Sequence, residues 1–78
     1  MFTLLNNGFT INLNNHYIIE EKRTSYPSIL KVKILDITST TILMENIDKK
    51  HIMPRMLVEN FVKNWKTIEK IGEILKLY

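Results

Sequence analysis

The chain has 78 residues, no cysteine and a formal net charge of +3, with 11 basic and 8 acidic residues. This length supports a single hydrophobic core, so we expect one domain over residues 1–78, without disulfides or thiolate metal sites. The charge is lower than is usual for a dedicated nucleic-acid binder of this size, and an apolar fraction of 45% excludes an intrinsically disordered chain.

The first third of the chain predicts short strands. Asn7-Gly8 is a two-residue hairpin signal, because both residues tolerate the positive φ of a type I′ turn. Apolar and polar residues alternate over residues 9–13, as they do on a half-buried strand. We therefore expect an N-terminal hairpin, then a strand over residues 16–22. A polar connection follows over residues 22–28, where Pro27 cannot donate to a central ladder.

The middle of the chain predicts an antiparallel meander. Residues 29–38 alternate between apolar and polar, and the alternation slips at residues 35–37, which indicates a β-bulge. Strands over residues 41–46 and 51–53 follow across tight turns. Pro54 ends the last of them, because proline has no backbone N–H to donate.

The last third leaves two alternatives open. Apolar residues from position 57 to position 75 are spaced by three and four, which predicts one amphipathic helix over residues 55–77, about 35 Å long. The alternative is a short helical turn over residues 57–62 and a closing strand over residues 65–71. The periodicity favours the helix, but Gly72 interrupts it.

Three parts of the sequence carry a resemblance to a known group: residues 32–38, residues 42–48, and Phe61 followed by residues 64–69. In these parts the chain resembles small SH3-like β-barrel proteins of phages and low-GC bacteria. The resemblance covers about half of the chain and implies that Phe61 lies in a short helical turn before the last barrel strand. It implies no catalytic residue, and the N-terminal hairpin and residues 72–78 are additions to it.

We therefore expect a mainly β fold: a small SH3-like antiparallel barrel with an N-terminal hairpin and a short helical turn. The resemblance decides for this fold over its alternative, an α+β fold that combines an antiparallel meander with one long C-terminal helix. The two differ in whether residues 65–71 form a strand or continue a helix.

The sequence lacks the residue combinations of a catalytic or cofactor site. His16 and His51 are the only histidines, and no cluster of carboxylates supplies the further ligands that a metal needs. The serines lack a nucleophile elbow, and Gly8 and Gly72 are too few and too far apart for a phosphate-binding loop. We therefore expect no enzyme activity, no metal and no cofactor.

Basic residues offer one candidate binding surface. Lys31 and Lys33 lie on the outward side of one predicted strand, and Lys49, Lys50 and Arg55 lie near the turn and strand that follow. Such a lysine face can contact a phosphate backbone or an acidic partner. The plainer interpretation is that alternating lysines form the solvated side of a half-buried strand and protect it from aggregation.

An apolar tail offers the other candidate surface. Ile71, Ile74, Leu75, Leu77 and Tyr78 add more apolar surface than one thin barrel readily covers. The tail therefore predicts contact with a protein partner or with a second copy of the chain in a homodimer. The alternative is that it packs on the domain's own sheet. We favour the tail as the partner-binding surface.

Together these observations predict a non-enzymatic protein-binding module. The bias toward Ile, Asn and Lys is typical of low-GC bacteria and their phages, so we expect a phage or mobile-element protein. The N-terminus lacks the basic start of a signal peptide and no apolar run could cross a membrane, which predicts the host cytoplasm. The expected partner is a host protein that the module inhibits, such as a CRISPR or other defence nuclease or its ribonucleoprotein complex. The alternative is a small nucleic-acid-binding regulator that uses the lysine face.

Overall fold

Eight short strands and one short helix make up residues 2–22 and 25–71, the part of the chain that the computed structural model describes. In chain order they are β1 (Leu4–Asn6), β2 (Phe9–Ile11), β3 (His16–Glu21), β4 (Ile29–Ile37), β5 (Thr41–Asn46), β6 (His51–Ile52), β7 (Met56–Leu57), α1 (Val58–Asn64) and β8 (Trp65–Lys70). The expected mainly β fold is therefore confirmed.

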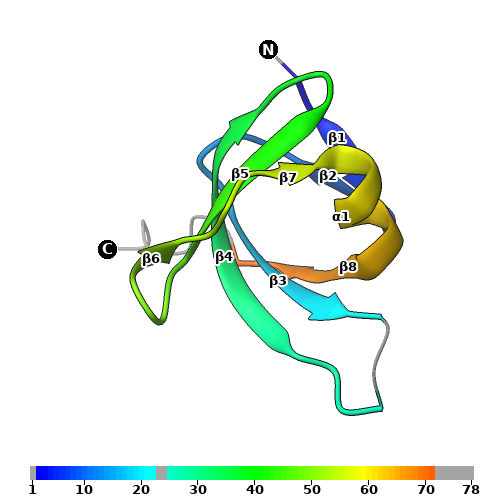
Figure 1. The fold of residues 1–78 in the computed structure, drawn as a ribbon, viewed down its shortest axis with the longest axis vertical. Coiled ribbons are helices and arrows are strands. Elements are labelled where there is room, and N and C mark those ends of the chain that lie inside the picture. The colour runs from blue at the N-terminus through cyan, green and yellow to red at the C-terminus, as the bar shows by residue number, and fades with distance from the viewer. Residues whose placement is uncertain (1, 23–24, 72–78) are drawn as a thin grey trace.

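The strands form one antiparallel sheet and a separate hairpin. The sheet has the order β6-β5-β4-β3-β8, with β7 also paired to β5, and β1 pairs with β2. The sheet curls so that α1 crosses from β7 to β8 on its open side (Figure 1). Among the described strands, β8 pairs with neither β6 nor β7, so the sheet is open at this point and does not close into a barrel.

The core lies on the inner face of the curled sheet. Successive side chains of a strand point to opposite faces, so every second residue of the central strands is buried. Within the described residues the buried apolar side chains are Ile11, Tyr17, Ile19, Val32, Ile34, Ile37, Ile42, Met44 and Phe61. One helix residue, Phe61, therefore joins side chains from three strands of the sheet, β3, β4 and β5, and from β2 of the hairpin.

The predicted bulge in β4 is present. The register between β4 and β5 shifts between Ile34 and Asp36, so that Leu35 has no direct partner. This extra residue returns Ile37 to the buried face, three positions after Ile34. The slip of the apolar pattern at residues 35–37 is thus the direct consequence of the bulge.

The last third of the described chain resolves the two alternatives. α1 spans only Val58–Asn64, and Trp65 already has extended angles, φ −128° and ψ 147°. Trp65–Lys70 then pair with β3, which would otherwise leave its backbone groups unpaired at the sheet edge. The predicted long helix over residues 55–77 is therefore wrong for the described residues, which end at residue 71 in this part of the chain. The alternative, a short helix followed by a closing strand, is confirmed.

The N-terminal hairpin is also confirmed, and its turn follows the Asn7-Gly8 signal. Asn7 has φ 53° and Gly8 has φ 85°, so both occupy the left-handed region that this turn requires. Asn6 pairs with Phe9 across it. β2 is shorter than expected, however: it ends at Ile11 instead of continuing to residue 13.

Two groups of hydrogen bonds hold this hairpin against the sheet. At one end the buried Tyr17 hydroxyl accepts a hydrogen bond from the Asn12 N–H at 2.9 Å and donates to the Thr10 carbonyl at 3.0 Å. At the other end the buried Asn6 amide binds β8, where its Oδ1 accepts hydrogen bonds from the N–H and the hydroxyl of Thr67. The same amide donates to the Trp65 carbonyl at 3.2 Å.

The substitution Tyr17→Phe tests the first of these groups. It keeps the buried ring but leaves the Asn12 N–H and the Thr10 carbonyl without this partner, so we expect the free energy of unfolding to fall by about 1–3 kcal/mol. Urea denaturation followed by circular dichroism measures the loss. Tyr26→Phe is the matched control, because Tyr26 is 92% exposed, and it should leave the midpoint unchanged. Equal midpoints for both variants would show that the Tyr17 hydroxyl does not hold the hairpin.

Candidate functional site

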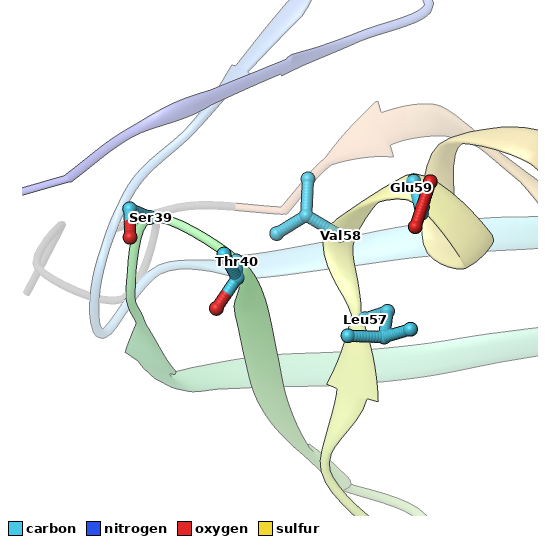
Figure 2. Close-up of a pocket in the computed structure, with 5 residues that line it drawn as sticks. All are labelled: Ser39, Thr40, Leu57, Val58 and Glu59. Carbon is cyan, nitrogen blue, oxygen red and sulfur yellow. The ribbon is translucent and has the colours of Figure 1, made fainter.

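A surface recess lies where the turn between β4 and β5 meets the start of α1. Ser39 and Thr40 line one side, Leu57, Val58 and Glu59 line the other, and the volume is about 270 Å³. Figure 2 shows the two sets of residues on the two segments, Ser39 and Thr40 on the turn and Leu57, Val58 and Glu59 on β7 and the start of α1. Small-molecule sites usually have about 300–1,000 Å³. The recess lies just below this range and is open to solvent, and its apolar lining can receive a side chain of a partner.

The turn that forms the first wall is held by Thr38. Its hydroxyl oxygen accepts hydrogen bonds from the backbone N–H of Thr40 at 3.2 Å and of Thr41 at 2.9 Å. Its own N–H donates to the Thr41 carbonyl at 2.9 Å. A threonine that bonds to the backbone two and three residues later fixes a tight turn. Ser39 and Thr40 are thus presented by a turn with a defined shape.

The second wall is tied to the first. Met56 and Leu57 pair with Ile42 and Thr41 at the start of β5. The Val58 N–H then donates to the Thr40 carbonyl at 2.8 Å, a bond that joins the first helical residue to the turn. Because both walls share backbone hydrogen bonds, the recess exists before any ligand arrives, which lowers the entropic cost of binding.

The chemistry of the recess is apolar with one acidic group. Leu57 is 46% exposed although it is a large aliphatic residue, whereas Val58 packs partly against the core. Glu59 lies in the first turn of α1 and is exposed. The apolar spacing from position 57 onward predicts that Leu57 lies on the apolar side of a helix, so this site is not among the expected ones. No local signal marks the recess, because Leu57 lies in β7 and Val58 begins α1, and the opposite wall comes from residues 39–40.

The structure places the lysine face among acidic side chains. Lys31 lies 4.0 Å from the Asp48 carboxylate, and Lys33 stands between Glu45 on β5 and His16 on β3. Opposite charges on neighbouring strands reduce the potential that a phosphate backbone would feel. Lys31 and Lys33 thus share one face, as expected, but that face is of mixed charge.

Of the three other predicted cations, Arg55 also has an acidic partner among the described residues. Arg55 binds the Asp36 carboxylate at 2.8 Å and also donates to the Thr41 hydroxyl at 3.2 Å. Lys49 and Lys50 are exposed in the turn after β5, where the Lys49 N–H donates to the Asn46 side chain at 3.1 Å. Three of the five predicted cations, Lys31, Lys33 and Arg55, therefore have an acidic side chain as a direct neighbour.

The predicted apolar tail begins at the end of β8. Ile71 is half-buried, and its N–H donates to the His16 carbonyl at 2.9 Å, so it continues the pairing with β3. Ile74, Leu75, Leu77 and Tyr78 lie outside the described residues. Their role as a partner-binding surface stays a prediction.

Several other large apolar side chains are exposed, but they are spread over the surface. In the described residues they belong to the N-terminal segment and hairpin, the β3–β4 connection, β4, β6, α1 and β8: Phe2, Leu5, Tyr26, Ile29, Ile52, Val62 and Ile68. Single exposed apolar residues are common on globular proteins and need no functional explanation. Leu57 differs from them because it lines a preformed recess.

Within residues 2–22 and 25–71, no three His, Asp or Glu side chains are placed to hold a metal ion together. In the same part of the chain no helix has the length and apolar character to cross a membrane. No protein-family model, curated protein or solved structure matches the chain.

Proposed function

We propose that this domain is a non-enzymatic binding module that recognises a protein through the recess between the β4–β5 turn and α1. The observation that carries the proposal is a preformed, mostly apolar recess of about 270 Å³, lined by the exposed Leu57. Protein interfaces draw most of their binding energy from a few apolar anchors in such pockets. The predicted tail from Ile71 onward would be a second contact area of the same module.

A protein partner is favoured over nucleic acid by the charges around the lysine face. Nucleic-acid binding depends on uncompensated cations that displace counterions from phosphates. Here Lys31 and Arg55 have acidic partners within ion-pair distance, and Lys33 faces Glu45. A small nucleic-acid-binding regulator is therefore the second candidate function.

In its specific form, the proposal is that the partner is a host defence nuclease, which the bound module inhibits. The support is the small size and the residue bias typical of phages and low-GC bacteria. A nuclease recovered with the module should cleave its substrate more slowly when the module is added in excess. Unchanged cleavage would contradict this form of the proposal while leaving protein binding intact.

Affinity capture with matched variants tests the proposed protein binding. From a lysate of a low-GC bacterium, the wild-type domain should retain one protein in a stoichiometric amount. Leu57→Ser should reduce its recovery at least about five-fold, as expected for the loss of an interface anchor. Ile52→Ser is the control, because Ile52 is exposed on β6 away from the recess, and it should retain the partner. An empty capture, or equal recovery with Leu57→Ser, would contradict recognition through the recess.

A titration against single- and double-stranded nucleic acid tests the second candidate. We expect no binding at low salt, because the lysine face is of mixed charge. Affinity that falls steeply with salt, and weakens in the double variant Lys31→Gln and Lys33→Gln, would favour the regulator over the protein-binding module.

A further inference from the structure

Glu59 is the one charged residue among the five that line the recess. The carboxylate forms no ion pair with any residue of the described ranges. Arg55, which directly precedes β7, forms an ion pair with Asp36 at 2.8 Å. Lys63 lies one helical turn later on α1, where it makes no ion pair with Glu59. The lining of the recess itself thus carries one negative charge beside its apolar wall, and Lys63 lies outside the lining.

An anionic ligand does not fit this end of α1. Backbone N–H groups at a helix start favour negative charge. However, the Val58 N–H is already bonded to the Thr40 carbonyl at 2.8 Å, and Glu59 supplies a carboxylate in the first turn. A second anion at this position would be repelled by the Glu59 carboxylate. A cation, in contrast, would gain a partner.

We infer that the recess binds an aliphatic side chain of a partner segment, and that the residue next to it in that segment is Lys or Arg. This inference rests on the proposed function. The aliphatic side chain packs on Leu57 and Val58, within a volume of about 270 Å³. The neighbouring ammonium or guanidinium group binds the Glu59 carboxylate at the rim. Ser39 and Thr40, which line the opposite wall, supply the polar groups that the segment's backbone meets. The occupant is thus a short, basic and apolar peptide segment.

Selection from a random-peptide display library tests this specificity without knowledge of the partner. Enriched peptides should share an aliphatic residue next to Lys or Arg. A synthetic peptide of the enriched sequence should shift the amide NMR signals of Thr40, Val58 and Glu59. It should bind Glu59→Gln about two- to five-fold more weakly than wild type, as expected for one exposed ion pair. Glu69→Gln is the matched control: it removes an exposed acid of β8 outside the recess and should bind as wild type.

The opposite results overturn the inference. No enrichment, enrichment without basic residues, or equal affinity for wild type and Glu59→Gln would each contradict it. If Glu59 acts only at the helix start, Glu59→Gln lowers the thermal midpoint and leaves peptide affinity unchanged, which also overturns it. A protein captured from the lysate and lost with Leu57→Ser, but retained by Glu59→Gln, would leave the proposed function standing and remove the cation preference alone.

Discussion

Phe61→Ala should leave the domain largely unfolded at room temperature. Phe61 is fully buried and brings α1 onto the core formed by the sheet and β2. Truncation of a buried phenylalanine to alanine costs about 3–5 kcal/mol, through lost burial and the cavity left behind. A single domain of this size has a stability of only about that amount. One substitution in a seven-residue helix therefore removes most of the free energy that keeps the domain folded.

Val62→Ala is the control for this prediction. Val62 lies next to Phe61 on the same helix and is 37% exposed, so its truncation should change the unfolding free energy by less than about 1 kcal/mol. Circular dichroism and urea denaturation measure both variants. If Phe61→Ala unfolds with the midpoint of Val62→Ala, α1 does not depend on Phe61 for its attachment to the core.

Asn6→Ala should lower the free energy of unfolding by roughly 2–4 kcal/mol, because it leaves several buried polar groups without partners. The Asn6 amide binds β8 as a neighbouring strand would: Oδ1 accepts from the Thr67 N–H and Nδ2 donates to the Trp65 carbonyl. The Thr67 hydroxyl also donates to Oδ1, at 2.7 Å, and Thr67 is fully buried. The hairpin turn thereby covers the outer edge of β8.

Asn60→Ala provides the comparison for Asn6→Ala. Asn60 is exposed on α1, so the same change of residue type should be neutral or slightly stabilising there, because alanine favours helix. Chemical denaturation of both variants gives the two free energies. Amide hydrogen exchange should also become faster at Thr67 in Asn6→Ala. Wild-type stability together with unchanged exchange at Thr67 would mean that the Asn6 amide does not secure this edge.

Local signals explain why much of the fold was predictable. The Asn7-Gly8 turn and the slip of alternation at residues 35–37 each depend on neighbouring residues alone, and both features are present. The end of α1 does not depend on neighbours alone. The apolar residues after Asn64 keep a helical spacing, but these residues pair with the edge of β3 and so form the strand β8. A pairing partner more than forty positions away in the sequence decided that element.

The recess was not predictable for a related reason. Its two walls come from residues 39–40 and residues 57–59, which are adjacent only because β7 pairs with β5. The buried role of Asn6 was equally hidden, since an asparagine before Asn7-Gly8 has the properties of an ordinary turn residue. The alternation along β4 correctly predicted that Lys31 and Lys33 lie on the same face of the strand. The acidic partners that compensate it, Asp48 and Glu45, became evident only from the strand register.

Hydrogen–deuterium exchange of the domain, alone and in the complex with its captured partner, tests the central claim most directly. Recognition through the recess predicts slower exchange over residues 38–41 and 57–60 in the complex, with little change over residues 31–33 of the lysine face. Protection of residues 31–33, with residues 38–41 and 57–60 exchanging as in the free domain, would contradict it.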